Sequence, residues 1–286
     1  FIKQNQPLTA ALGLLLAFAS TCILLSKLSF LLPRDGGREY AVEGKLSAGK
    51  PRGAGIIFIL VFMVSALLFA PINLETVIYL ILIVAEMLTG FMDDAAERPW
   101  GGLKKGLLDL TVAIIVAITY LNFNSNTIRL AVFEMDLTLP PVLFGLLTVA
   151  LVWGSINVTN CSDGVDGLSG TLAIITLATF YVIDNIMGKD DFTFLILIFI
   201  ICVLGYLWYN ATPSRLMMGD AGSRAMGIFI SITALKSDSP FMYLPVAMVF
   251  ILDGGLGLLK VALIRVCKIH ILNHVRTPLH DHVRKN

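Results

Sequence analysis

The sequence predicts an all-α, polytopic integral membrane protein, and three observations support this expectation. Hydrophobic residues make up 57% of the 286 residues and charged residues only 14%, whereas soluble domains contain about a quarter charged residues. The mean hydropathy is +0.83. Long apolar segments recur along the chain, and the loops between them are too short to hold a soluble domain. We therefore expect residues 1–286 to form a single transmembrane domain.

A run of about 18 apolar residues is long enough to cross a bilayer as a helix. Nine segments meet or approach this length, and those at 53–72 and 192–210 are the clearest because they contain no charge. The loop 122–139 alternates polar and apolar residues, which predicts a small β-hairpin. The nine expected spans are 8–32, 53–72, 74–92, 106–121, 140–158, 168–187, 192–210, 222–235 and 241–265.

The distribution of lysine and arginine predicts the orientation, because cytoplasmic loops of membrane proteins carry an excess of both. If the N-terminus lies outside, the inner loops hold fourteen basic residues and the outer segments four. We therefore expect an extracytoplasmic N-terminus. With this orientation, every dense polar motif of the chain falls on the cytoplasmic face.

Adjacent carboxylates end the third apolar segment, in the motif Gly90-Phe-Met-Asp-Asp94. A solvated helix end would explain them as well as a functional site would. Alternatively, Asp93 and Asp94 are ligands of a divalent metal or a general base, because neighbouring like charges raise the pKa of one of the two groups.

A polar loop between two apolar segments contains Asp163 and Asp166 beside glycines, together with the amides Asn157 and Asn160. Lipid cannot satisfy an exposed polar backbone, so such a loop is costly unless it has a function. The Asp-Gly pattern alone is common in turns. Together with the amides it offers the hard oxygen ligands that magnesium prefers.

Two further polar motifs lie in the second half of the chain. Asp220 stands between glycines where an apolar helix begins, so it either caps that helix or lies beside backbone N–H groups that receive phosphate oxygens. His280 and His282 flank a carboxylate in a basic tail, where they either bind metal or phosphate or are surface residues without a function. The basic loop 33–52 sets the topology or attracts an anionic headgroup.

Taken together, these motifs place carboxylates, amides, basic loops and a histidine pair on one face of the membrane. Phosphoryl transfer depends on positioning and on charge neutralisation by cationic side chains and magnesium. A site at the membrane surface would allow a lipid phosphate to meet a soluble, nucleotide-linked donor. The sequence therefore favours phosphoryl-transfer chemistry.

Four motifs, in the same order and at similar spacing, resemble those of the polyprenyl-phosphate N-acetylhexosamine-1-phosphate transferases. They cover most of the chain, and the last looks most like the phospho-N-acetylmuramoyl-pentapeptide transferase branch of that superfamily. The motifs are Gly90-Phe-Met-Asp-Asp94, Asn157-Val-Thr-Asn-Cys-Ser-Asp-Gly-Val-Asp-Gly-Leu168, Asn210 with Met218-Gly-Asp-Ala-Gly-Ser223, and Pro278-Leu-His-Asp-His282.

The resemblance implies a magnesium-dependent homodimer of ten-helix subunits in the bacterial cytoplasmic membrane. It implies transfer of phospho-MurNAc-pentapeptide from UDP-MurNAc-pentapeptide to undecaprenyl phosphate, which yields lipid I and UMP for peptidoglycan synthesis. The expected partners are thus the two substrates and the lipid bilayer, and not nucleic acid. Nine apolar segments are visible, so we expect that the C-terminal helix of the family is missing or that this member is shorter.

The resemblance also implies roles for the matching residues. Asp220 would bind magnesium. Asp93 would be the base or would contact the phosphate, with Asp94 beside it. Asp163 would be a further acid of the catalytic site, with Asn160 near it.

The donor would be bound by the remaining motif residues. Gly164, Val165, Asp166 and Asn210 would line the uridine and sugar region, and the histidines would lie near the diphosphate or the sugar. Met217 stands where the family has an aromatic residue that stacks on uracil, which would weaken the stacking.

The lysines of the chain depart from the family pattern. Glu97 stands where the family has a lysine after the Asp pair, so Lys104 or Lys105 would supply the cation of that loop. In the first cytoplasmic loop, the phosphate-binding lysine would be shifted to Lys45 or Lys50.

Two mechanisms are compatible with these residues. In direct displacement, Asp93 deprotonates or orients the lipid phosphate, which attacks the β-phosphate of the donor. In a two-step route, a carboxylate first forms a covalent phosphosugar intermediate. We favour direct displacement because the acceptor phosphate is already a competent nucleophile at neutral pH.

Two other functions are compatible with the sequence. A sister transferase would use UDP-GlcNAc as the donor. A secondary transporter is the alternative from another class, because charges within spans can mark ion pathways, although the sequence shows no inverted repeat with broken helices. These charges are Lys27, Glu86, Asp109, Asp184, Asp253 and Lys260.

Overall fold

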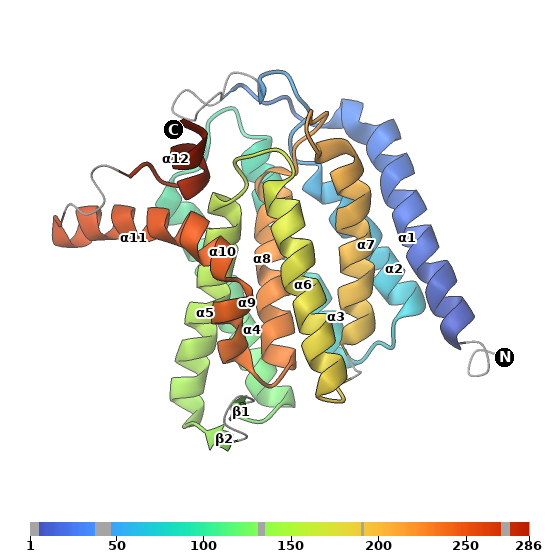
Figure 1. The fold of residues 1–286 in the computed structure, drawn as a ribbon, viewed down its shortest axis with the longest axis vertical. Helices are drawn as coiled ribbons and strands as arrows, with labels where there is room; N and C mark the ends of the chain where they lie inside the picture. The colour runs from blue at the N-terminus through green and yellow to red at the C-terminus, as the bar shows by residue number, and fades with distance from the viewer. Residues whose placement is uncertain (1–5, 38–46, 131–134, 190–191, 270–274, 286) are drawn as a thin grey trace.

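The computed structural model describes residues 6–37, 47–130, 135–189, 192–269 and 275–285. The described chain is a bundle of helices with one small hairpin (Figure 1). Within these residues, six helices are long and apolar enough to cross a membrane, and a bent pair of helices would raise the number to seven. The expectation of an all-α, polytopic membrane protein is confirmed.

The eight long helices follow the first eight apolar segments of the sequence. Their starts obey local rules: the Asn73 side chain accepts from the Thr76 N–H over 2.8 Å at the start of α3, and Pro141 opens α5, where its missing N–H costs nothing. The helices are α1 Gln6–Leu28, which continues into the 3₁₀ helix η1 Ser29–Leu31, α2 Gly55–Phe69, α3 Leu74–Asp94, α4 Gly102–Phe123, α5 Pro141–Cys161, α6 Leu168–Ile186, α7 Thr193–Asn210 and α8 Gly219–Lys236.

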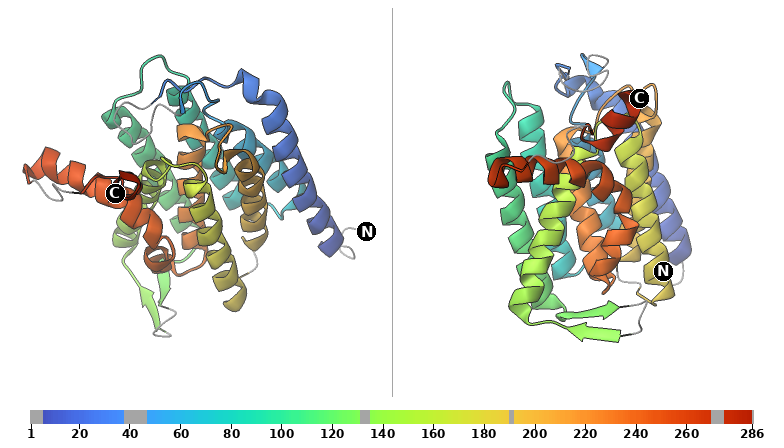
Figure 2. Two further views of the ribbon diagram at one scale, coloured as in Figure 1. Left: turned by 45° about the horizontal axis from the view of Figure 1, so that its top comes forward. Right: turned by 60° about the vertical axis from the view of Figure 1, so that its left-hand side comes forward.

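The expected hairpin is present. Strands β1 Thr127–Leu130 and β2 Met135–Thr138 pair antiparallel, with Thr127 opposite Thr138. The hairpin lies at the end of the bundle opposite to the C-terminal helix α12 Leu279–Lys285 (Figures 1 and 2).

Helix α8 lies in the middle of the bundle, and every residue from Gly219 to Leu235 is buried. Small residues allow this position, because they let neighbouring backbones come close. A Cβ added at Gly227 would lie 2.6 Å from Ile156 Cα of α5, and one added at Gly55 would overlap the backbone of Gly222. Helix α8 therefore contacts α2, α3, α5 and α6 directly.

The ninth apolar segment is a broken helix. Its two parts, Pro240–Val246 and Met248–Arg265, are bent by 66° relative to each other. Pro245 lies just before the break, lacks an N–H and disrupts the helix. The segment comprises η4 Pro240–Met242, α9 Tyr243–Val246, α10 Met248–Phe250, the π-helical turn η5 Ile251–Gly255, α11 Leu256–Ala262 and the π-helical turn η6 Leu263–Cys267, and α11 projects sideways from the bundle (Figure 1).

The nine expected spans are thus helical, but three differ from simple membrane-crossing helices. The segment 53–72 gives α2, which has only 15 residues. The segment 222–235 gives the buried helix α8, whose sequence includes three charged residues. The segment 241–265 is the bent pair. Length and apolar composition alone could not distinguish these cases.

The loops that were expected on one face do lie at one end of the bundle, here called the polar end. There α3, α5 and α7 end and α4, α6 and α8 begin, with α12 above them (Figures 1 and 2). The polar motifs, although distant in sequence, are therefore brought together.

Candidate active site

Three carboxylates meet at the polar end, where α3 ends and α8 begins. Asp93 and Asp94 occupy the last turn of α3, and Asp220 occupies the first turn of α8. The two helices approach closely, because a Cβ added at Gly90 would overlap the Asp220 carbonyl. Glycine at position 90 therefore permits the three side chains to form one acidic cluster.

Two cations neutralise this acidic cluster. Arg52 Nε lies 2.8 Å from Asp94 Oδ1, and an outer nitrogen of the same guanidinium lies 3.3 Å from Asp220 Oδ1. Lys105 Nζ lies 2.5 Å from Asp93 Oδ2 and 2.8 Å from Asp220 Oδ2. Burial alone would lower the pKa of Arg52, but the neighbouring carboxylates outweigh burial and raise it. Asp220 is therefore held between two positive charges.

Asp94 caps the start of α8. Its two oxygens accept from the backbone N–H groups of Asp220 over 3.1 Å and Ala221 over 3.0 Å. A carboxylate at this place also interacts favourably with the helix dipole. Gly219, with φ of +67°, leaves no room for a Cβ beside this carboxylate. The helix start is thus capped by Asp94 from α3, not by Asp220 itself, and Asp94 orients Asp220 through the backbone.

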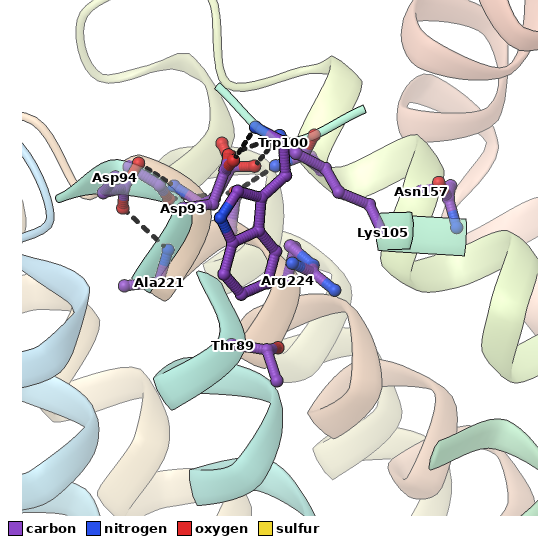
Figure 3. A network of polar contacts seen from close by, with 12 residues as sticks. Thr89, Asp93, Asp94, Trp100, Lys105, Asn157, Ala221 and Arg224 are labelled. Carbon is purple, nitrogen blue, oxygen red and sulfur yellow. Dashed lines mark hydrogen bonds and ion pairs between the residues drawn. The ribbon is translucent and has the colours of Figure 1, made fainter. Parts of the chain in front are cut away.

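Asp93 points to the opposite side from Asp94 (Figure 3). The backbone N–H of Trp100 donates to Asp93 Oδ1 over 2.6 Å, and Lys105 binds Oδ2. Lys104 lies elsewhere: its Nζ is 3.2 Å from the centroid of the Trp100 ring, a cation–π contact. Of the two lysines that the sequence left open, Lys105 lies in the acidic cluster and Lys104 lies on the tryptophan.

Asn160 reaches the acidic cluster from the last turn of α5. Its Nδ2 donates to Ser223 Oγ over 3.0 Å. Ser223 in turn donates to the carbonyl of Gly219 over 3.0 Å. Asn160 therefore ties α5 to the first turn of α8.

The loop 162–167 is fixed by contacts with two other loops. Asp166 Oδ2 accepts from the Ser214 N–H over 3.1 Å and lies 3.5 Å from Lys50 Nζ. Lys50 Nζ also donates to Ser214 Oγ over 2.7 Å. Asn210 Oδ1 accepts from the Gly167 N–H over 2.9 Å. Asp166 and Asn210 thus maintain the shape of the loop, and Lys50 lies beside it.

The other predicted residues lie around these groups. Met217 is half-buried, and its N–H donates to the Pro51 carbonyl over 2.8 Å, so its backbone joins the first loop to the start of α8. Asp163 and Val165 are half-buried in the loop 162–167. His282 lies on α12, where its Nδ1 accepts from the Arg276 N–H over 3.5 Å. Lys45 lies outside the described residues.

His280 reaches the loop 162–167 from α12. Its Nδ1 lies 2.8 Å from Asp253 Oδ2, and its backbone N–H donates to Asp253 Oδ1 over 2.8 Å. A Cβ added at Gly164 would overlap His280 Nε2. The imidazole is thus held between Asp253 of η5 and the backbone of Gly164.

A second polar layer lies beneath the acidic cluster, within the bundle. Arg224 forms ion pairs with Asp109 and, over 2.7 Å, with Glu86, and Asn157 Nδ2 donates to Asp109 Oδ2 over 3.1 Å. Arg224 and Asp109 follow Asp220 and Lys105 by one helical turn, so each lies on the same helix face as a member of the cluster. Figure 3 shows Arg224 and Asn157 near Lys105. Asn157 was expected in the polar loop, but it lies within α5, and its side chain supports this buried layer.

Sequence reasoning missed the roles of Arg52, Asp253 and Arg224. Arg52 was noted only as part of a basic loop, and Asp253 only as a charge in an apolar segment. A charge within a span requires a partner, and this rule could have paired Arg224 with the acids of neighbouring helices. The pairing of Asp253 with His280 depends on the bend of the ninth segment, which has no such signal.

The carboxylate of Asp220, with that of Asp93 beside it, is a donor of the kind that magnesium prefers. Both carboxylates direct an oxygen to Lys105 Nζ, so the two side chains already share a cation. Magnesium typically takes one or two carboxylates and completes its shell with water and substrate phosphate. Among the described residues, no group of three or more His, Cys, Asp and Glu side chains is arranged to hold a metal ion. A bound magnesium ion would therefore depend on phosphate oxygens of the substrate.

The fold and the site define a class: a multi-pass membrane protein with a charged, cation-bridged carboxylate site at one end of its helical bundle. Comparison with known proteins is more specific. The sequence profile described as glycosyl transferase family 4 matches residues 76–238, from the third residue of α3 to just beyond the end of α8.

Curated relatives give the same result over the full chain. A phospho-N-acetylmuramoyl-pentapeptide-transferase of Treponema pallidum is 36% identical, over 100% of this chain and 84% of the relative. Proteins of the same name from Symbiobacterium thermophilum and Rubrobacter xylanophilus are 31% and 26% identical, over 85% and 96% of this chain and 76% and 88% of the relatives. The chain therefore belongs to glycosyl transferase family 4 and to the phospho-N-acetylmuramoyl-pentapeptide-transferases, which confirms the resemblance inferred from its motifs.

Proposed function

We propose that the protein transfers phospho-MurNAc-pentapeptide from UDP-MurNAc-pentapeptide to undecaprenyl phosphate, which yields lipid I and UMP in peptidoglycan synthesis. The family membership supports the reaction. The observation that carries the proposal for the site is the acidic cluster, in which Asp93 and Asp220 share Lys105. Mutual charge neutralisation of this kind is what phosphoryl transfer requires.

In the proposed mechanism, the lipid phosphate attacks the β-phosphate of the donor directly, and UMP leaves. Asp93 orients or deprotonates the lipid phosphate. Lys105 and Arg52 stabilise the negative charge that spreads over the phosphate oxygens in the transition state. Magnesium, held by Asp220 and substrate oxygens, would supply additional charge neutralisation. Asp94 keeps Asp220 in place.

An apolar groove supports a path for the polyprenyl chain. It measures about 340 Å³ and is lined by α5 from Phe144 to Val158 and by the bent segment from Pro240 to Ile251. The groove extends from the hairpin end, at Ile128 and Leu235, to Val158 in the last turn of α5. A lipid tail in this groove would place its phosphate at the polar end of the bundle. We expect Leu151→Trp, in the wall of the groove, to raise the KM for the lipid and leave the KM for the nucleotide donor unchanged.

We infer that the polar end faces the cytoplasm, because the loops at this end carry most of the lysine and arginine. The N-terminus would then be extracytoplasmic, in the cytoplasmic membrane of a bacterium. A homodimer is part of the proposal, as the family resemblance implies. Mass measurement of the purified protein in detergent or nanodiscs tests the dimer, and labelling of single cysteines from either side of the membrane tests the orientation.

The donor can be tested directly. Purified protein is incubated with undecaprenyl phosphate and either UDP-MurNAc-pentapeptide or UDP-GlcNAc, and UMP and the lipid product are measured. The proposal predicts turnover with the first donor. Turnover with UDP-GlcNAc alone would identify the sister transferase instead.

Direct displacement is tested in the absence of lipid. The proposal predicts that no phosphosugar becomes attached to the protein when the donor alone is present. Detection of such an adduct by intact-protein mass spectrometry would establish the two-step route.

A further inference from the structure

Asp253 makes two hydrogen bonds with one residue. Its Oδ1 accepts from the His280 backbone N–H and its Oδ2 lies at the His280 ring nitrogen Nδ1, both over 2.8 Å. Both side chains are only 9% exposed. The carboxylate thus determines both the backbone position of His280 and the direction of its ring.

This geometry also determines which ring nitrogen carries hydrogen. An ionised carboxylate only accepts hydrogen bonds, so Nδ1 must be a donor whether the imidazole is neutral or charged. Nε2 is then the nitrogen that remains for other partners. Nε2 lies against Gly164, in the loop between α5 and α6 that the family resemblance assigns to the donor.

The element that carries Asp253 is rigidly placed. Residues Ile251–Gly255 form a π-helical turn, and such turns are frequent at functional sites. A Cβ added at the next residue, Gly254, would overlap the Val158 carbonyl of α5. The same added Cβ would lie 3.0 Å from Ser162 Oγ, at the end of α5. The carboxylate is therefore fixed relative to the loop that begins at Ser162.

We propose that Asp253 is a positioning residue, which holds His280 with Nδ1–H directed to the carboxylate and presents Nε2 to the diphosphate or sugar of the donor. Asp253 itself does not contact the substrate. This inference rests on the proposed function for the identity of the ligand, but the ring geometry can be measured without any substrate.

The substitution Asp253→Asn distinguishes control of the His280 ring tautomer from the hydrogen bond that holds the His280 backbone. An amide has one oxygen and one NH2 group, and the backbone N–H of His280 can only donate. If the amide oxygen accepts from that N–H, the NH2 group faces Nδ1, which must then become an acceptor. The neutral ring is thereby forced into the opposite tautomer, with hydrogen on Nε2. Asp253→Glu, which keeps both acceptor oxygens, should retain the original tautomer.

The tautomer can be observed because the chain contains only four histidines. The protein, labelled with ¹⁵N-histidine, is studied by NMR in detergent at a pH where the ring is neutral, and the His280 signal is identified with His280→Gln. We expect Nδ1–H in the unaltered protein and in Asp253→Glu, and Nε2–H in Asp253→Asn. Asp184→Asn is the matched control: it removes another buried carboxylate, near the far end of α6, and should leave the His280 signal unchanged.

Turnover provides the second readout. We expect kcat for UMP release to fall roughly 10- to 100-fold in Asp253→Asn, by analogy with the loss of partners that orient metal-ligating histidines, and to recover substantially in Asp253→Glu. Asp184→Asn should keep kcat within about twofold. An Nε2–H tautomer in the unaltered protein would overturn the proposal even if Asp253→Asn does not fold. A folded Asp253→Asn protein with unchanged tautomer or unchanged kcat would overturn it too. Absence of UMP release by the unaltered protein would instead contradict the proposed function and leave the tautomer test intact.

Discussion

Lys105 on α4 donates to Asp220 on α8 across 2.8 Å. The same ammonium lies 2.5 Å from Asp93 on α3, so one side chain links three helices at the polar end. Its neighbour Lys104 lies on the Trp100 ring. The geometry thus separates two lysines that are adjacent in sequence and chemically identical.

Replacement of Lys105 by methionine should abolish most activity. Without the ammonium, the carboxylates of Asp93 and Asp220 repel each other, and the transition state loses a positive charge. We expect kcat to fall on the order of 100-fold or more, measured as UMP release. The matched substitution Lys104→Met should lower kcat less than about threefold, because that side chain lies on the tryptophan. Equal effects of the two substitutions would contradict the assignment.

The adjacent carboxylates Asp93 and Asp94 should respond differently to loss of charge. Asp94→Asn removes the ion pair with Arg52 and one of two acceptors at the start of α8. We expect it to lower the Tm in detergent as well as the activity, since a lost cap alone costs about 1 kcal/mol. Asp93→Asn should leave the Tm nearly unchanged and lower kcat on the order of 100-fold. The assignment fails if Asp93→Asn is the less stable variant.

The buried layer beneath the cluster should contribute mainly to stability. Arg224→Met leaves Glu86 and Asp109 without their buried cation, and loss of one partner of a buried ion pair costs on the order of 3 to 5 kcal/mol. Thermal unfolding should show a Tm lower by roughly 10 °C. Arg129→Met, on the exposed face of the hairpin, is the control and should change the Tm little. A Tm equal to that of the unaltered protein would show that Arg224 does not stabilise the bundle.

Gly164→Ala should displace His280. The added Cβ would overlap Nε2 of the imidazole, so α12 or the loop 162–167 must move. We expect kcat to fall at least about tenfold by loss of orientation, with little change in Tm. Gly102→Ala, where an added Cβ meets no atom within 4 Å, should behave as the unaltered protein does. Full activity of Gly164→Ala would mean that the position of His280 is unimportant.

Much of this architecture could be predicted from the sequence. The apolar segments predicted the helices, and the alternation of polar and apolar residues predicted the hairpin. The topology expected from the basic loops placed Asp93, Asn160 and Asp220 at one end of the bundle. These features depend on local composition and period, which a single sequence contains.

The remainder depends on tertiary packing. That Asp94 caps α8 follows from contact between two helices, permitted by Gly90, and not from any local motif. The backbone of Met217 is hydrogen-bonded to Pro51 and Ala54 of the first loop, and this contact between distant loops has no local signal in the sequence. The pairing of His280 with Asp253 needs the bend at Pro245, whose direction the sequence does not specify.

The cluster around Asp220 is proposed to perform a magnesium-dependent transfer, and the release of UMP measures this reaction. UMP release from UDP-MurNAc-pentapeptide is followed with undecaprenyl phosphate, with and without magnesium, for the unaltered protein and for Asp220→Asn, with the Tm as a control for folding. We predict release that requires lipid and magnesium, and a loss on the order of 1,000-fold in folded Asp220→Asn. Undiminished release by folded Asp220→Asn, or in the presence of a magnesium chelator, would contradict a magnesium-dependent role of Asp220.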